Sequence, residues 1–287
     1  MRLRAALLAL LALLLTACAG PASSAPEVSV SGEPGSKPIL TYVAPLDPGR
    51  TYRSTIWPGT GPELRDGEPV LLNYWVENAR TATVVAESYS ASPVTRELTP
   101  AALGADLYRT LSGAHTGARL LQVSPPGTGA GNDVPTVTVV DVLPLRATGQ
   151  HVDPPQGLPT VKLAADGAPT VTPTGTDPPT SLVAQPLIRG SGRQVTRSDT
   201  VTVQYVGFSW KTGEAFDSTW SRGSPSSFSL VDVPAWADGL ADQPVGSQLL
   251  LVVPPTYALG ATQSQELSGQ TVVFVVDILA VAAGGTS

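Results

Sequence analysis

The sequence predicts an α+β protein made of two tandem copies of one module, each an antiparallel sheet wrapped around one short helix. Gly and Pro contribute 28 residues each to the 287, and charged residues only 14%, which disfavours long helical bundles and coiled coils. Short apolar runs of strand length alternate with turn residues along most of the chain. The same motifs also occur twice in the same order. A hydrophobic fraction of 42% is enough to bury a core.

The N-terminal segment has the pattern of an export signal. Met1–Arg4 carries two arginines, and Ala5–Leu15 is an uninterrupted apolar run. This run is shorter than the roughly 20 residues that span a bilayer, and it matches the apolar region of a signal peptide. The next residues, Leu15-Thr16-Ala17-Cys18, resemble the lipobox of bacterial lipoproteins. We therefore expect residues 1–17 to be removed and Cys18 to carry a lipid. An ordinary signal peptide cleaved nearby, with Cys18 incidental, is the alternative.

A lipid on Cys18 would anchor the protein to the outer face of the bacterial cell membrane. Residues 18–36 are rich in Ala, Gly, Pro and Ser, and they predict a flexible tether between the anchor and the folded part. Export also removes ATP and nicotinamide cofactors from the expected reagents.

Composition excludes several classes of function. The net charge is −6, and no cluster of Lys or Arg follows the first four residues, so a nucleic-acid partner is not expected. Only two His and one Cys are present, which argues against a zinc site. We expect no metal and no cofactor.

Three sequence blocks recur in the same order and predict a duplicated domain. Each copy has a Gly-X-Gly element followed at equal distance by a strand that ends in Tyr, then a Leu…Gly…Pro-Pro block, then an apolar strand with a central Asp. The matched pairs are Gly59–Tyr74 with Gly190–Tyr205, Leu111–Pro126 with Leu240–Pro255, and Val139–Leu143 with Val275–Leu279. We place the two domains at residues 37–147 and 161–283, joined by a linker at 148–160. Chance agreement of short apolar runs is the alternative.

The second copy is predicted to be mostly strand. Residues 201–205 alternate apolar and polar side chains, which indicates a half-buried strand with Val201, Val203 and Tyr205 on its inner face. Leu249–Val253 and Val272–Leu279 are denser apolar runs, typical of central strands.

One helix is predicted in this copy, at Pro234–Leu240. Proline is favourable in a first helical turn, and Gly239 suits the helix end. Trp236 and Leu240 lie one turn apart and therefore share a face.

Six successive blocks of the second copy resemble the motifs of FKBP-type peptidyl-prolyl cis-trans isomerases. The blocks are Val203–Gly207, Gly213–Ser218, Trp236–Leu240, Val245–Ser247, Pro254–Tyr257 and Thr271–Phe274. The resemblance implies a twisted antiparallel sheet curled around one short helix, in agreement with the pattern of strands. The resemblance therefore implies two tandem FKBP-like domains, of which the first is degenerate.

The resemblance also implies an apolar pocket that binds proline. Its floor would be the helix tryptophan, Trp236, and its walls would be the rings of Tyr205, Phe216 and Phe274. Val233 would lie at the helix entry, and Asp217 would be the polar member of the pocket. The aspartate is expected to hold Tyr205 in position rather than to act as a base. All four Phe of the protein lie in the second copy. Further substrate contacts are expected at Ser226, Tyr257 and Leu259.

Two departures from the family pattern predict weaker binding. Leu259 stands where the family has a tyrosine whose hydroxyl bonds the ligand carbonyl, and one lost hydrogen bond is worth about 0.5–1.5 kcal/mol. Ser226 stands where an aromatic residue edges the pocket, which leaves Phe228 as a neighbour that faces the core.

The first copy keeps even less of the pocket. The tryptophan position falls near Leu107, Thr138 stands in place of Phe274, and no Phe-Asp pair occurs in Val84–Ser90. Of the pocket set only Tyr74 remains. We expect this copy to keep the fold without an isomerase pocket.

Other motifs have simpler interpretations. His115 is expected to be a solvated turn residue, and Gly127–Asn132 a hairpin tip rather than a phosphate loop, because it lacks a Lys and no helix pattern follows it. The aromatic residues of the second copy could also be core alone, and Asp217 a turn residue.

The sequence therefore predicts a lipid-anchored peptidyl-prolyl isomerase that acts on X-Pro bonds of exported polypeptides, with macrolide inhibitors as candidate ligands. The alternatives are a non-catalytic lipoprotein that holds partners or unfolded clients, and an adhesion protein of two β-sandwiches. A tryptophan on a helix, as at Trp236, distinguishes the first hypothesis from the third.

Overall fold

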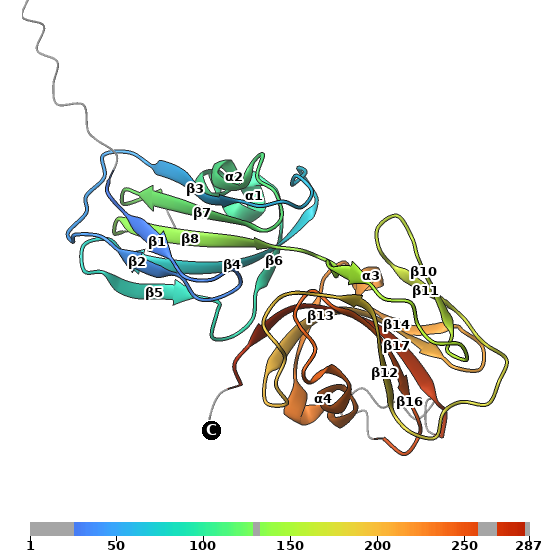
Figure 1. Ribbon diagram of the computed structural model, residues 1–287. Helices are drawn as coiled ribbons and strands as arrows, with labels where there is room; N and C mark the ends of the chain where they lie inside the picture. The colour runs from blue at the N-terminus through green and yellow to red at the C-terminus, as the bar shows by residue number, and fades with distance from the viewer. Residues whose placement is uncertain (1–25, 129–132, 258–268, 285–287) are drawn as a thin grey trace, which may run out of the picture.

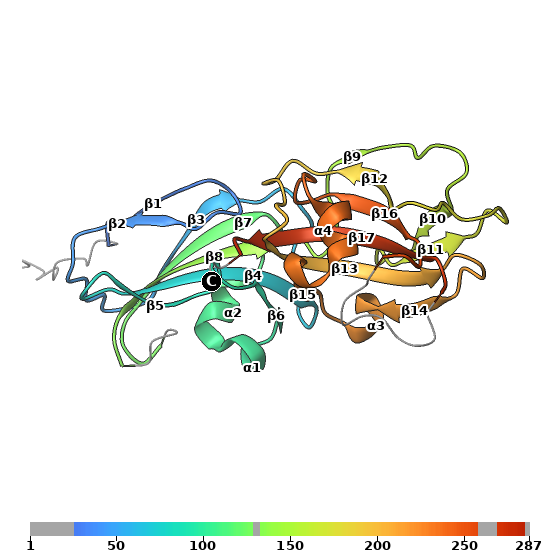
Figure 2. The same ribbon diagram turned by 90° about the horizontal axis from the view of Figure 1, so that it is seen from below.

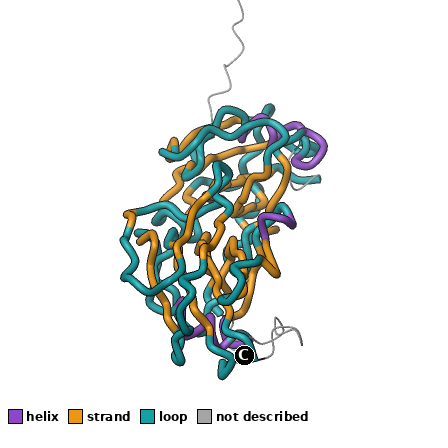
Figure 3. Tube along the Cα trace, turned by 90° about the vertical axis from the view of Figure 1, so that its right-hand side faces the viewer, coloured by secondary structure: helices purple, strands orange, loops and turns teal. Residues whose placement is uncertain are grey.

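The computed structural model describes residues 26–128, 133–257 and 269–284. Its two large sheets, of six and seven strands, form two modules that lie side by side (Figures 1 and 2). Strands and loops make up most of the described chain, and the helices are short (Figure 3). Residues 1–17, Cys18 and Leu259 lie outside the described part. Within that part, no helix is both long and apolar enough to cross a bilayer.

The second module is an antiparallel sheet that curves around helix α4 (Pro234–Leu240) (Figure 1). Its strand order is β14-β13-β17-β16-β12-β9, and β15 pairs with the first part of β13. The strands are β9 (Gln150–His151), β12 (Val183–Arg189), β13 (Thr200–Ser209), β14 (Ala215–Ser218), β15 (Ser226–Ser229), β16 (Gln248–Val253) and β17 (Val272–Ala282).

The predicted helix is confirmed residue for residue. It begins at Pro234 and buries Ala235, Trp236, Ala237, Gly239 and Leu240. Gly239 lies inside the helix rather than at its end. A Cβ on this glycine would stand 2.8 Å from the Leu251 side chain, so glycine here lets α4 pack closely against β16. The single turns α3 (Thr219–Arg222) and η1 (Leu230–Asp232) were not predicted, because one turn carries no sequence periodicity.

The first module repeats this topology. Its order is β3-β7-β8-β4-β5 with β6 paired to β4, so every strand has a counterpart in the second sheet in the same place. Helix α2 (Ala105–Leu111) corresponds to α4 and follows the short α1 (Pro100–Leu103). The strands are β3 (Tyr52–Pro58), β4 (Pro69–Asn78), β5 (Thr83–Glu87), β6 (Val94–Glu97), β7 (Ala118–Ser124) and β8 (Thr136–Leu143).

The expectation that residues 201–205 form a half-buried strand is wrong. Val201, Val203 and Tyr205 do face the helix side, but Thr202 and Gln204 are 3% and 7% exposed. The outer face of the sheet is also covered, because the hairpin of β10 (Thr160–Leu163) and β11 (Pro169–Thr172) packs Val161 and Val171 against it. The segment expected as a linker contributes to the same sheet: Gln150–His151 pairs with β12.

The flexible tether expected at residues 18–36 is likewise contradicted for its last part. Ser29–Ser31 forms strand β1, which pairs with β2 (Ile39–Thr41). Val28, Val30 and Leu40 pack against the outer face of the first sheet. The alternation of Val28 and Val30 was the sequence signal for this strand. The strand packs on the sheet because the outer face of the sheet is apolar.

His115 is exposed, as expected for a turn residue, and forms one isolated bridge with Glu63. Gly127 lies in the connection between β7 and β8, of which residues 129–132 are not described.

Asp141 of β8 and Asp277 of β17 occupy equivalent positions in the two sheets, but their carboxylates have different hydrogen-bond partners. In the first module the carboxylate of Asp141 accepts from Arg119 Nε at 2.6 Å and from Arg119 Nη2 at 2.7 Å, and both residues are buried. In the second module Gln248 takes the place of Arg119. Its Nε2 donates to Asp277 at 2.7 Å, and the backbone N–H of Ala147 donates at 2.8 Å. Burial raises the pKa of Asp277 to about 6, although both hydrogen bonds oppose the shift.

Replacement of aspartate by asparagine should change the free energy of unfolding differently at these two positions. In Asp141→Asn, Arg119 loses its counter-charge while buried, which should cost about 3–5 kcal/mol of unfolding free energy at pH 7.5. Asp277→Asn removes a buried charge that has no cationic partner within hydrogen-bonding distance, so this variant should be no less stable than the wild type at pH 7.5.

The pH dependence tests the same point. Because the pKa of Asp277 is higher in the folded chain than in the unfolded one, the wild type should gain stability as the pH falls through 6 toward 4. Between pH 7.5 and 4.5 the gain over Asp277→Asn should be about 2 kcal/mol. Urea unfolding at the two pH values measures it, and equal pH slopes for the two proteins would contradict the assignment.

Candidate active site

The candidate site is an aromatic cluster between α4 and the inner face of the second sheet. Trp236 contacts three rings edge to face, with centroid separations of 5.1 Å to Tyr205, 5.1 Å to Phe228 and 5.6 Å to Phe274. Phe216 of β14 extends the cluster by an edge contact of 5.7 Å with Phe274. The structure thus brings together the four aromatic residues predicted for the pocket.

Exposure differs sharply within this cluster. Trp236, Phe274 and Tyr205 are 2%, 2% and 3% exposed, whereas Phe216 is 38% exposed. The indole therefore lies beneath the other rings instead of forming an open floor, and Phe216 is the ring that solvent reaches. The indole N–H of Trp236 is buried without a hydrogen-bond partner among the described residues.

Gly207 makes the outer part of the cluster possible. A Cβ at this position would stand 2.6 Å from the Phe216 ring and 2.9 Å from the Phe274 ring. Contacts this short require a shift, so a side chain at residue 207 would push both rings away from β13. The glycine within the Tyr-Val-Gly block thus gives the two rings their place against the sheet, and no turn requires it.

The hydroxyl of Tyr205 is held by two charged groups. It donates to Asp217 Oδ2, and Arg222 Nη2 donates to the Tyr205 oxygen at 3.2 Å. Arg222 Nη1 donates to the other oxygen of Asp217, which closes a three-residue network at the rim of the cluster. The guanidinium also lies 5.5 Å from the centroid of the Tyr205 ring. Burial and the bond to Asp217 raise the pKa of Tyr205 to about 12, so the phenol stays neutral.

A short helix places Arg222 in this network. Ser218 caps α3 by accepting from the N–H of Ser221 at 3.3 Å, and Gly223 ends the turn in the left-handed region. The Thr219 hydroxyl accepts from the N–H of Tyr205 at 2.8 Å and donates to the carbonyl of the same residue at 3.2 Å. The helix is thereby fixed to β13 directly beside the tyrosine.

Sequence reasoning did not identify Arg222. The available signal was its position: it follows Asp217 by one helical turn and a cap, and no Lys or Arg occurs in the chain after it. Such a cation close to an expected pocket carboxylate indicates an ion pair.

The remaining candidate residues lie around the cluster. Val233 is 5% exposed and precedes α4, where it packs into the same core. Tyr257 packs against this core, and its hydroxyl is 3.4 Å from Asp238 Oδ2. Ser226 lies in β15 opposite Val203 and is partly buried. Phe228 faces the core, as expected.

The first module has no counterpart of this cluster among its described residues. Leu107 of α2 packs against an aliphatic core, and Thr138 is buried on the sheet with its hydroxyl unpartnered. Tyr74 is kept, and its N–H donates to the Ser88 hydroxyl at 2.9 Å, as that of Tyr205 does to Thr219. The local backbone arrangement is preserved without the aromatic lining.

Comparison with known proteins decides the family. A family model for FKBP-type peptidyl-prolyl cis-trans isomerases matches residues 191–279. The "Probable FK506-binding protein" of Corynebacterium glutamicum is 40% identical over 103 residues, which are 35% of this chain and 87% of that protein. The chain belongs to the FKBP-type peptidyl-prolyl cis-trans isomerase family. The predicted membership is therefore confirmed, and it rests on the second module.

Other members of the family show the same coverage of this chain. The "FK506-binding protein" of Streptomyces anulatus is 34% identical over 113 residues, covering 37% of this chain and 91% of that protein. The isomerase FkpA of Escherichia coli is 38% identical over 102 residues, which are 35% of this chain and 37% of FkpA. The crystal structure of FkpA matches 44% of this chain and 53% of that chain at 31% identity, with a TM-score of 0.33.

The network around Tyr205 leads to a spectroscopic prediction. In Asp217→Ala the hydroxyl loses the acceptor that favours its protonated form, while Arg222 still favours the charged form. The pKa of Tyr205 should fall from about 12 toward the ordinary value of about 10. A ¹³C-tyrosine NMR titration measures it, and Asp153→Ala is the control because its carboxylate is solvent-exposed. An unchanged Tyr205 pKa in Asp217→Ala would show that the hydrogen bond is absent in solution.

Proposed function

We propose that this protein catalyses cis-trans isomerisation of X-Pro bonds in exported polypeptides, and that the second module performs the reaction. The aromatic cluster around Trp236, with the Tyr205 hydroxyl fixed at its rim, is the observation that supports the proposal most. It lies in the segment that the family model matches.

The reaction requires no nucleophile and no proton donor from the protein. Rotation about the prolyl amide bond crosses a barrier of about 18–20 kcal/mol, which arises from resonance between the nitrogen and the carbonyl. Transfer of the imide from water to an apolar surface removes hydrogen bonds from its carbonyl, and this disfavours the charge-separated resonance form. A site that binds the twisted imide more tightly than either planar isomer accelerates both directions.

Each member of the cluster has a distinct role in this proposal. Phe216 is exposed and supplies the first apolar contact for the prolyl ring, and Phe274 lies directly behind it. Tyr205 presents a neutral hydroxyl at the rim, and Asp217 and Arg222 fix its direction. No side chain has to transfer a proton, so the rate should be independent of pH while the phenol stays neutral.

The indole takes part only if the rings above it separate. Trp236 is 2% exposed here, so a prolyl ring would reach it after side-chain rotations of the kind that often accompany binding. The free energy needed for this opening lowers the apparent affinity. The closed cluster is also the observation that favours the alternative of a non-catalytic, client-holding lipoprotein.

Activity of the full chain on a proline tetrapeptide decides between these functions. Phe216→Ala should lower kcat/KM about tenfold, because it removes the accessible ring without opening the core. Leu259→Tyr should raise kcat/KM by about twofold to tenfold, the value of one ligand hydrogen bond. Leu259→Phe is its control, since it adds the ring without the hydroxyl and should leave the rate near that of the wild type.

Three results would count against the isomerase proposal. They are a wild-type rate equal to that of the uncatalysed peptide, an unchanged rate in Phe216→Ala, and a bell-shaped pH profile between pH 6 and pH 9, which would indicate proton transfer. An equal effect of Leu259→Tyr and Leu259→Phe would refute the placement of the missing hydroxyl but not the activity.

We also propose that the protein is exported and anchored to the outer face of the membrane by a lipid on Cys18. The lipobox-like segment supports this, and FK506-type macrolides are candidate ligands because relatives are named for binding FK506. In cells fed a labelled fatty acid, the wild type should carry the label and enter the detergent phase. Cys18→Ser should lose the label, and a labelled Cys18→Ser protein would disprove the assignment.

A further inference from the structure

The outer edge of strand β5 carries neither a lysine nor a proline. This strand ends the first sheet, and on its outer side it pairs with no other strand of the described residues. Val84 and Val85 are 46% and 49% exposed, and Glu87 at the end of the strand is its one charged residue. Exposed edges usually carry lysines or prolines that block further pairing. Strand β5 instead presents unpaired backbone groups between apolar side chains.

A cavity of about 570 Å³ adjoins this edge, at the junction of the two modules. It is lined by Asn73 and Trp75 of β4, by Val84 and Glu87 of β5, and across the junction by residues 280–283 at the end of β17. The register pairs Trp75 with Glu87 and Glu77 with Val84, so the side chains of Trp75, Glu87 and Val84 share one face of the sheet. A cavity of this size lies in the range of about 300–1,000 Å³ typical of ligand sites.

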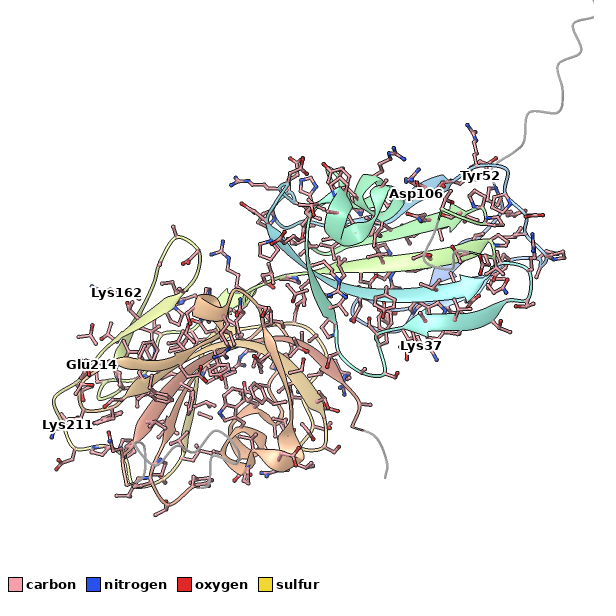
Figure 4. All side chains as sticks on the ribbon, turned by 180° about the vertical axis from the view of Figure 1, so that it is seen from behind. Lys37, Tyr52, Asp106, Lys162, Lys211 and Glu214 are labelled. Carbon is pink, nitrogen blue, oxygen red and sulfur yellow. The ribbon has the colours of Figure 1, made fainter. Side chains whose placement is uncertain are left out.

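The lining is mixed: besides Trp75, Val84 and the alanines it includes polar side chains (Ser36, Asn73, Ser88 and Ser90) and charged ones (Lys37, Glu87 and Arg193). The ammonium group of Lys37 lies 4.9 Å from the Trp75 ring centroid, on the β5 side of the first module (Figure 4). Arg193 of the second module also lines the cavity and donates to Asp199 at 2.9 Å. The opposite wall is formed largely by alanines, whose short side chains leave space beside Trp75.

We propose that the β5 edge and this cavity bind an extended apolar segment of an unfolded polypeptide, which adds a strand to the first sheet. Backbone groups of β5 would supply hydrogen bonds that any sequence can satisfy, and the cavity would accept one apolar side chain beside Trp75 and Val84. Only a polypeptide offers both the matching backbone pattern and the side chain. The identity of the occupant as a client rests on the proposed function, since an isomerase of exported proteins meets unfolded chains.

A second copy of this chain fits the edge less well. The end of β17 already stands across the cavity from β5, and a whole second sheet would have to enter the same space. The register shift between Val76 and Glu77 also bends β5, so the rigid edge of another sheet fits this strand less well than a flexible unfolded segment, which can follow the bend.

Two substitutions in the full chain test the site. Val84→Lys places a charge on the edge and in the cavity, and Ala283→Trp fills the cavity from an exposed position of the other module. The control is Leu163→Lys, which alters a side chain of equal exposure, 46%, on the β10–β11 hairpin. The probe is fluorescein-labelled, reduced and alkylated α-lactalbumin, whose binding is measured by fluorescence anisotropy. Circular dichroism and thermal melts confirm that each variant is folded.

Both site variants should weaken binding by at least about fivefold, a factor typical of one lost hydrogen bond or packing contact. Leu163→Lys should stay within about twofold of the wild type. Tetrapeptide isomerisation should be unchanged in all three variants, because β5 lies outside the aromatic cluster. If Val84→Lys fails to fold, Ala283→Trp alone decides.

Unchanged binding in the folded site variants would overturn the proposal, as would an equal loss in Leu163→Lys, which would indicate unspecific apolar contact. A wild-type dimer in sedimentation that Val84→Lys makes monomeric would assign the edge to a second copy instead. A wild-type chain that binds the probe through β5 but does not isomerise the tetrapeptide would refute the isomerase function and leave the polypeptide site standing.

Discussion

The second module depends on the packing of one indole. Trp236 joins α4 to the inner face of the sheet through edge contacts with Tyr205, Phe228 and Phe274 at centroid separations of 5.1–5.6 Å. Gly239 brings the helix close enough for these contacts. The same rings form both the core and the wall of the candidate site, so loss of the indole would affect the stability of the module and the shape of the candidate site together.

The two modules show how one topology supports different interiors. At equivalent positions Arg119 and Asp141 form a buried ion pair, whereas Gln248 and Asp277 form a buried hydrogen bond. Thr138 replaces the Phe274 ring. The strand order survives these exchanges because it is set by the connections and by the alternation of side chains, not by a particular interior residue. This independence allows one copy to carry the aromatic cluster while the other has an aliphatic interior.

Both large sheets carry apolar side chains on both faces, so each face must be buried against another element. The helices cover the inner faces. The hairpins β1–β2 and β10–β11 cover the outer faces, where Val30 packs near Trp75 and Val171 near Phe208. These hairpins lie in segments whose Gly, Pro and Thr content suggests connections. Their few valines become buried only because a neighbouring sheet presents an apolar surface to them.

The sequence alone determined the duplication, the strand-rich class, the helix at Pro234–Leu240 and the aromatic members of the site. The first three features follow from local spacing and periodicity, which the chain carries wherever it folds, whereas the aromatic members of the candidate site are implied by the resemblance to the family's motifs. It did not determine that Thr202 and Gln204 are buried, that Arg222 binds the Tyr205 hydroxyl, or that the β5 edge adjoins a cavity. Each of these depends on segments distant in sequence that meet only in the folded protein. Contacts of that kind are fixed by packing of one surface on another, and only the pairing of Arg222 with the nearby Asp217 has a local signal in the sequence.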